Sequence, residues 1–202
     1  MLQQLIPFLT ASILLTLSPG PDIIYVLVQS ISNGKKAGIV TTLGLVSGIL
    51  IHTSLVAFGV SAIIKASPIL FILIKVFGAL YLFYLAYKVF KSDSSISLRE
   101  VPQKKSKNLF RQGFIMNVLN PKVTIFFLAF FPGFLWEPEG NTIFQFYLLG
   151  FLFMMQALLI FGAVALLAGK ISEYLLQHRR SGVYLKWIQV VVFTGIGILI
   201  LI

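Results

Sequence analysis

The chain of 202 residues contains no cysteine, only two histidines and only six acidic residues. Without cysteine, disulfide bonds, thiol redox chemistry and thiolate metal sites are excluded. His52 and His178 stand far apart and match no metal-ligand spacing, so we expect no metal and no cofactor. A membrane-embedded enzyme would need a nucleophile with a base, and Ser18 has no histidine near it in the sequence.

Charged residues are also scarce, at 11%, whereas 58% of the residues are hydrophobic. A chain of this length cannot bury so many apolar side chains in one water-soluble core, so the composition indicates an integral membrane protein. The formal net charge of +10 would suggest a nucleic-acid partner in a soluble domain. Here the basic residues lie between apolar stretches, where they report topology, and we expect the partner to be the lipid bilayer and not a nucleic acid.

Six apolar stretches are present, each near or above the ~20 residues that a ~30 Å hydrocarbon layer requires. They comprise residues 2–30, 37–64, 69–90, 110–135, 142–168 and 183–202. No lysine or arginine precedes Lys35 and no small-residue cleavage pattern follows the first stretch, so we expect it to be retained as a span. The predicted fold class is an all-α, multi-pass membrane protein with six transmembrane helices.

The basic residues are sorted between the two sides of the predicted membrane. Thirteen of the sixteen lie in the odd-numbered connections or at the stretch ends that border them, after the first, third and fifth stretches, and only Lys65 lies in an even-numbered connection. The positive-inside rule therefore places the odd connections in the cytoplasm and both termini outside.

The first apolar stretch is interrupted by Ser18, Pro19, Gly20, Pro21 and Asp22. Each interior proline costs a helix about 3 kcal/mol, and an aspartate at mid-membrane costs roughly 2.5 to 3.5 kcal/mol. A simple membrane anchor gains nothing from these residues. We interpret them as the break of a discontinuous helix that forms half of a solute site.

Asp22 is the only acidic residue within an apolar stretch. Its carboxylate could cap the half-helix that follows Pro21 by accepting hydrogen bonds from the first amides. It could instead bind a substrate ammonium group and carry a proton. One side chain could do both.

A second break, Asn120-Pro121-Lys122, lies near the centre of the fourth stretch. Pro121 frees the carbonyl of Asn117, and a kink at this depth leaves backbone groups that a neighbour, a water molecule or a substrate must satisfy. Lys122 is a candidate counter-ion for Asp22 or for a substrate carboxylate. Alternatively, it reaches the membrane surface along its own helix.

Glycines and one histidine form a stripe in the second stretch, with Gly44, Gly48 and His52 at steps of four. Small residues at this spacing let another helix approach closely. We expect His52 to be a hydrogen-bonded packing group, with a proton relay as the alternative.

Three further polar residues lie within apolar stretches. Lys75 lies two turns into the third stretch and either reaches the outer interface or faces the solute site. Gln156 and Asn117 are buried polar candidates, and such residues more often hold helices together than contact a ligand.

Three spans, a linker and three spans suggest a duplication. The predicted units are residues 1–90, a basic cytoplasmic linker at 91–109, and residues 110–202. One weak alignment at an offset of 102 supports the repeat: Phe8, Leu17 and Pro19 match Phe110, Leu119 and Pro121. An odd number of spans per half inverts one half relative to the other, which brings the two proline breaks to similar depth.

Several motifs together resemble the LysE/RhtB family of amino-acid exporters across nearly the whole chain. These are the 18–22 run, Gly34-x3-Gly38, Leu43-Gly44 with Gly48 and His52, Gly78-Ala79-x-Tyr81-Leu82, and Asn120-Pro121-Lys122 followed by Phe126-Phe127. The resemblance implies a carrier in the cytoplasmic membrane of a prokaryote. Such a carrier expels lysine, arginine, threonine, homoserine, leucine or related small metabolites and is driven by the proton gradient.

The predicted function is therefore a secondary transporter that exports amino acids by alternating access at a midplane site between the two broken helices. The amide ends of these helices and Lys122 would hold the substrate carboxylate, and Asp22 with the freed carbonyls would hold the ammonium. The alternatives are a passive channel, a structural membrane subunit or, less favoured, a membrane-embedded enzyme. The substrate, the coupling ion and any homo-oligomer stay open.

Overall fold

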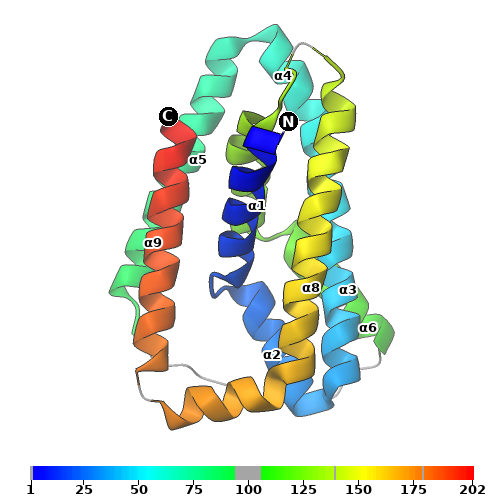
Figure 1. Cartoon of the computed structure of the whole chain (residues 1–202), viewed down its shortest axis with the longest axis vertical. Helices are drawn as coiled ribbons and strands as arrows, with labels where there is room; N and C mark the ends of the chain where they lie inside the picture. The colour runs from blue at the N-terminus through cyan, green and yellow to red at the C-terminus, as the bar shows by residue number, and fades with distance from the viewer. Residues whose placement is uncertain (1, 94–105, 139, 179) are drawn as a thin grey trace.

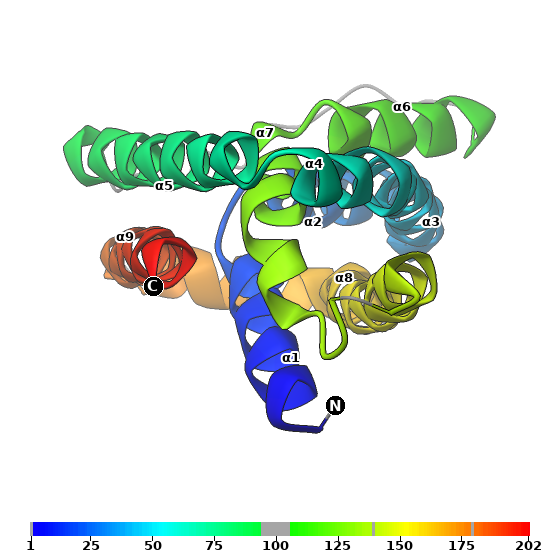
Figure 2. The same ribbon diagram turned by 90° about the horizontal axis from the view of Figure 1, so that it is seen from above.

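The computed structural model describes residues 2–93, 106–138, 140–178 and 180–202, and every regular element in these ranges is a helix. Most of the predicted linker, together with residues 139 and 179, lies outside them. Figure 1 shows an elongated bundle with both termini toward the same end. Figure 2 shows the segment that follows α7 in the middle of the bundle, surrounded by the longer helices.

In both halves of the chain, most helices are separated by only a few residues. The first half forms α1 (Leu2–Leu17), α2 (Pro21–Asn33), α3 (Lys35–Ser54), the π-helical turn η1 (Leu55–Val60), α4 (Ser61–Ala66) and α5 (Pro68–Lys91). The second forms α6 (Ser106–Val118), α7 (Pro121–Ile125), the π-helical turn η2 (Phe126–Phe130), the 3₁₀ turn η3 (Phe131–Phe134), α8 (Thr142–Gln177) and α9 (Ser181–Leu201).

The helices have the length and composition of membrane spans. Four stretches of the described chain are long and apolar enough to cross a membrane on their own: Lys35–Ile63, Pro68–Lys91, Thr142–Gln177 and Ser181–Leu201. Two further pairs of helices pass the same test together, but α1 and α2 meet at 53°, and the pair on either side of Asn120 meets at 46°. If each bent pair is one span, the described chain has up to six, which agrees with the predicted number.

Prolines set both bends. α1 ends at Leu17, Gly20 is extended, and α2 begins with Pro21, where the missing amide would have had no helical partner. α7 begins with Pro121 in the same way, and the side chain of Asn120 caps it by accepting from the amide of Lys122 at 3.0 Å. The two predicted breaks are therefore present at the predicted residues.

One predicted boundary is wrong. We expected the fifth span to end at residue 168, but α8 continues to Gln177 and includes Lys170, which we placed in a loop. Residues 169–177 contain no proline, and most are good helix formers, so nothing local stops the helix. At 1.5 Å per residue α8 is about 54 Å long, and Figure 1 shows its last part turned across the end of the bundle opposite the termini.

The stripe of small residues in α3 faces α6, as close helix packing requires. A side chain at Gly44 would overlap the backbone of Phe110, and one at Gly113 of α6 would overlap the backbone of Thr41. One turn further along α3, Gly48 lies against the side chain of Asn117. The predicted close approach of another helix is confirmed, and it joins the first half of the chain to the second.

Aromatic side chains fill the centre of the bundle between the breaks and the end that carries the termini. Phe8, Phe126, Phe127 and Phe131 are fully buried. The rings of Phe127 and Phe131 stack with centroids 4.3 Å apart, and Phe8 meets Phe131 edge to face at 5.2 Å. This packing fixes α1 against the second half-helix of the other break.

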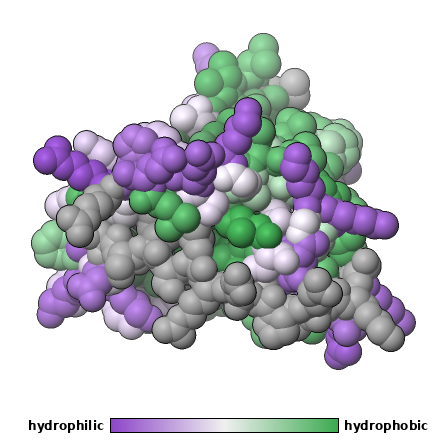
Figure 3. Space-filling view, turned by 90° about the horizontal axis from the view of Figure 1, so that it is seen from below, coloured by the Kyte–Doolittle hydropathy of each residue, from purple (hydrophilic) through white to green (hydrophobic). Residues whose placement is uncertain are grey.

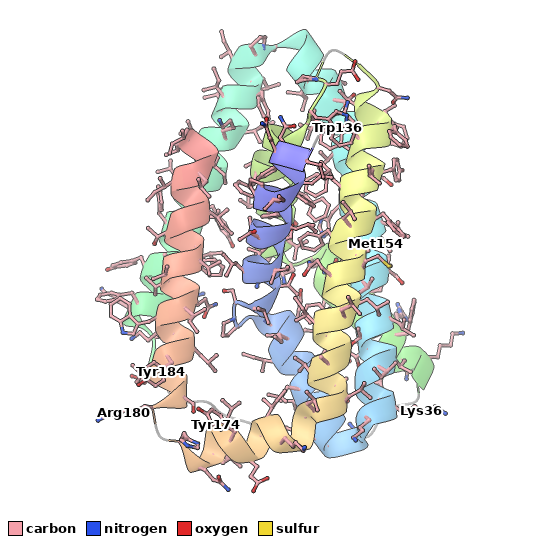
Figure 4. All side chains as sticks on the ribbon, viewed as in Figure 1. Lys36, Trp136, Met154, Tyr174, Arg180 and Tyr184 are labelled. Atoms are coloured by element: carbon pink, nitrogen blue, oxygen red, sulfur yellow. The ribbon has the colours of Figure 1, made fainter. Side chains whose placement is uncertain are left out.

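Two basic residues of the predicted cytoplasmic connections lie at the end opposite the termini. Figure 4 shows Lys36 and Arg180 at that end and Trp136 near the other. Figure 3 looks onto the same end and shows hydrophilic residues over much of its rim. Lys36 and Arg180, from two of the three predicted cytoplasmic connections, therefore lie at the same end of the molecule (Figure 4).

We predict that Gly44→Leu destabilises the protein, because the new side chain must separate α3 from α6. Overpacking of this kind costs about 1–3 kcal/mol. The measurement is the apparent unfolding temperature of purified protein in detergent. Gly162→Leu on α8 is the matched control, because a side chain there meets open space. Equal unfolding temperatures for the two variants would contradict close packing at Gly44.

Candidate functional site

The two helix breaks meet inside the bundle, although they lie about 100 residues apart in the sequence. Figure 1 shows the break between α1 and α2 about midway along the long axis. The side-chain amide of Asn120 donates to Oδ2 of Asp22 at 2.8 Å, which links the second break to the first. Asp22 and Asn120 are only 4% and 5% exposed, so water contributes little to this contact.

Lys122 extends from the start of α7 to the end of α1. Its Nζ donates to the carbonyl oxygens of Leu15 at 2.9 Å and Ser18 at 3.0 Å, and the residue is 7% exposed. The carbonyl of Leu15 is one that Pro19 leaves without a helical partner. An ammonium at this position also complements the negative end of the α1 dipole. Lys122 therefore caps α1, and it does not extend along its own helix to the membrane surface.

The carboxylate of Asp22 lies in the first turn of α2, where the helix dipole favours a negative charge. Gly20 is the residue that precedes the helix, and no side chain caps it. Oδ2 accepts from Asn120, and Oδ1 has no hydrogen-bond partner among the described residues. The capping hydrogen bond considered for Asp22 is thus not formed, and one carboxylate oxygen is free to accept.

His52 supports the second break from the side of α3. The carbonyl of Asn117, which Pro121 frees, accepts from the amide of Asn120 at 2.9 Å and lies 3.1 Å from Nε2 of His52. A hydrogen bond to a carbonyl requires the proton on Nε2. His52 is 2% exposed, and its ring lies 5.5 Å from that of Phe127. The histidine therefore supports the break from the α3 side.

A cavity of about 20 Å³ lies between the breaks and α8, with room for about one water molecule. Its polar lining comes from Thr16, Asp22, Asn117 and Lys122, and aromatic residues of α8 close the opposite wall. A small amino acid does not fit in this volume. In this conformation the cavity is therefore too small for an amino acid.

Two residues join the site to α8. Nε2 of Gln156 donates to Oγ1 of Thr16 at 2.9 Å, and Oε1 of Gln156 is buried without a partner among the described residues. Sequence reasoning proposed Gln156 and missed Thr16. The only signal for Thr16 is a hydroxyl two residues before the break inside an apolar run.

The predicted site residues thus fall into four groups. The side chains or carbonyls of Ser18, Asp22, Asn117, Asn120 and Lys122 gather at the breaks. Pro19, Gly20 and Pro21 form the turn, and a side chain at Gly20 would lie 3.1 Å from Nζ of Lys122. His52 and Gln156 contact the site from neighbouring helices, whereas Lys75 lines a separate cavity.

Buried polar atoms without partners indicate which ligand chemistry the site can satisfy. Within the described ranges these include Oδ1 of Asp22, Oγ of Ser18 and Oε1 of Gln156, two of which can only accept. Two of the three protons of Lys122 are already donated to carbonyls. Because buried acceptors without donors are costly, a ligand that supplies N–H groups suits this site. Among described residues, no three histidine, cysteine or acidic side chains lie together.

Comparison with known proteins identifies the class. The family model of the LysE type translocator matches residues 13–202, and the chain belongs to this family. It is therefore a multi-pass membrane protein of a transport family and not of an enzyme family. The resemblance stated from the motifs is confirmed.

Relatives of the chain occur in bacteria. The chain is 28% identical to the uncharacterised membrane protein YrhP of Bacillus subtilis (strain 168). The alignment is 207 residues long and covers 98% of each chain. It is 30% identical to the homoserine/homoserine lactone efflux protein of Salmonella typhimurium, with 83% of this chain and 82% of that protein covered. The protein of the same description from Salmonella typhi is 31% identical over the same shares. No solved structure matches the chain.

We predict that Lys122→Met destabilises the fold, because the carbonyls of Leu15 and Ser18 lose their donor. A buried polar group without a partner costs about 1–3 kcal/mol. The apparent unfolding temperature of the purified protein should therefore fall clearly. Lys36→Met is the matched control, because Lys36 is exposed at the start of α3. If both variants unfold at the same temperature as the unchanged protein, Lys122 does not hold α1.

Proposed function

We propose that this protein is a secondary transporter that exports amino acids or closely related small metabolites across the cytoplasmic membrane of a prokaryote. The observation that supports this most directly is the contact between the two broken helices, with a buried carboxylate that keeps one oxygen free. Broken helices that meet at mid-membrane are the usual place for solute and ion sites in secondary transporters. Membership of a translocator family supports the same conclusion.

The α-ammonium group is the part of the solute that Asp22 binds. Two relatives are described as exporting both homoserine and its lactone. The lactone keeps the ammonium but has its carboxyl group in an ester, so the positive group is what the two compounds share. In this chain the free oxygen of Asp22 can accept from an ammonium, while Lys122 is occupied by α1. We therefore assign the ammonium to Asp22 as the primary contact.

Lys122 couples solute binding to movement of the helices. A solute carboxylate that attracts the ammonium of Lys122 competes with the carbonyls of Leu15 and Ser18 for it. Losing this cap loosens the end of α1 from the start of α7, because the freed carbonyls have no donor in the membrane interior. For a solute with a free carboxylate, binding and opening then use the same hydrogen bonds.

Proton coupling is assigned to Asp22. A protonated carboxyl group has no charge with which to hold an ammonium, so a proton and the solute compete for the residue. Proton entry from outside then releases the solute, and solute binding from inside releases the proton. The net result is antiport of one proton against the solute.

The wider architecture follows from the same proposal. Residues 1–90 and 110–202 form two inverted repeats, residues 91–109 connect them in the cytoplasm, and both termini lie outside. The basic residues at the end opposite the termini support this orientation. A passive channel is the alternative, and counterflow separates the two, because only a carrier exchanges labelled for unlabelled solute.

We predict that Asp22→Asn reduces export at least about tenfold while the protein still inserts. Asn120 can donate to the new amide oxygen as it does to the carboxylate, so the fold is kept, but the ammonium loses its charged partner. A charged hydrogen bond is worth about 1.5–3 kcal/mol, and 1.4 kcal/mol is a factor of ten. The measurement is efflux from cells preloaded with dipeptides that together cover the amino acids.

Asp93→Asn is the control, because Asp93 is an exposed acidic residue after α5. Both variants must be present in the membrane at the level of the unchanged protein. Undiminished export by Asp22→Asn would remove Asp22 from the mechanism. If the unchanged protein increases the efflux of no amino acid, the proposed substrate class is wrong.

A further inference from the structure

A second, larger cavity lies toward the end of the bundle that carries the termini. Its volume is about 270 Å³, close to the lower end of the ~300–1,000 Å³ of typical small-molecule sites. Four parts of the chain form its walls, namely α1, α5, the η2–η3 segment and α9. Figure 2 looks onto this end, where α1, α5 and α9 lie around the segment that follows α7. Both halves of the chain therefore contribute to it.

Among the described residues that line this cavity, Lys75 is the only charged one. The other walls are apolar or aromatic, and include Phe71, Phe130, Phe134 and Leu199. Lys75 is partly buried and forms no hydrogen bond or ion pair with any residue that the structure describes. An ammonium with low-dielectric walls and no counter-ion attracts an anion more strongly than an exposed lysine does.

The cavity is in line with the site at the breaks. The ring centroid of Phe193 on α9 lies 5.9 Å from Nζ of Lys122, and Ile200, two turns further along α9, lines the cavity. Two turns of helix correspond to about 10 Å. Between the two places, Phe126 and Phe130 are buried and lie with ring centroids 5.0 Å apart. A solute that moved from the breaks along α9 toward Lys75 would have to displace these packed rings.

We propose that this cavity is an outward-facing anion site in which Lys75 receives the carboxylate of the departing solute. This inference rests on the proposed function and on the orientation with both termini outside. It gives the carboxylate a partner of its own, separate from the ammonium site at Asp22. In the described conformation the cavity at the breaks has a volume of about 20 Å³ and this one about 270 Å³, so of these two only the larger has room for a small solute.

The test uses the absence of cysteine from the chain. Gly133 lines the cavity, and a side chain there meets open space, so Gly133→Cys introduces one reporter thiol without a clash. Intact cells are treated from outside with the anionic 2-sulfonatoethyl methanethiosulfonate or the cationic 2-(trimethylammonium)ethyl methanethiosulfonate. We expect Lys75→Gln to lower the anionic-to-cationic rate ratio roughly tenfold. Lys36→Gln, at the opposite end, should leave the ratio unchanged.

Competition identifies the anion. An equimolar mixture of the common amino acids without cysteine should slow the anionic reagent, and the same mixture as methyl esters should not. Protection by the free acids must disappear in Lys75→Gln. A rate ratio that does not depend on Lys75, or a thiol that reacts only after the membrane is dissolved, would overturn the proposal. A charge preference without protection by the free acids overturns the solute assignment and points to a lipid phosphate as the anion.

Labelling does not depend on transport, so its failure is distinct from failure of the proposed function. If efflux is found and labelling shows no anion preference, the exporter lacks this outer site. If labelling shows the site and efflux is absent, the proposed function fails and the solute assignment fails with it.

Discussion

The ammonium of Lys122, bound to the carbonyls of Leu15 and Ser18, is the contact on which the centre of this protein depends. In a membrane interior no water replaces a missing backbone partner, so a helix that stops midway needs a donor from elsewhere in the chain. The chain supplies that donor from the opposite half. The same arrangement places Asn120 against Asp22, so the contacts that stabilise the breaks also set the geometry of the proposed solute site.

The breaks are rigidly supported on one side and loosely on the other. On the α3 side, glycines bring α6 into backbone contact, and His52 holds the carbonyl that Pro121 frees. On the α8 side, the hydrogen bond between Gln156 and Thr16 borders the small cavity, and nearby polar atoms have no partner among the described residues. Movement of α8 relative to α1 therefore loses fewer contacts than movement of α6 relative to α3. If the proposed site opens, this difference favours opening on the α8 side.

Local chemistry explains what could be predicted from the sequence. Proline has no amide hydrogen, so both breaks could be placed to the residue, and the glycine stripe of α3 predicted a close helix neighbour. Contacts between distant residues could not be predicted. Nothing in the sequence tells which carbonyls Lys122 reaches, that Thr16 bonds to Gln156, or that Lys75 lines a cavity of its own. These contacts depend on how the halves pack, as does the path of α8 beyond residue 168.

The most direct test of the central claim is chemical modification of Asp22, because this residue is the acidic group at the breaks and keeps one oxygen free. Purified protein in lipid vesicles is treated with dicyclohexylcarbodiimide, and modification of Asp22 is quantified by mass spectrometry. We predict that an exported amino acid and its methyl ester both slow the modification, because both keep the ammonium, while the N-acetyl derivative does not. Equal modification rates with all three compounds would contradict binding of the solute at Asp22.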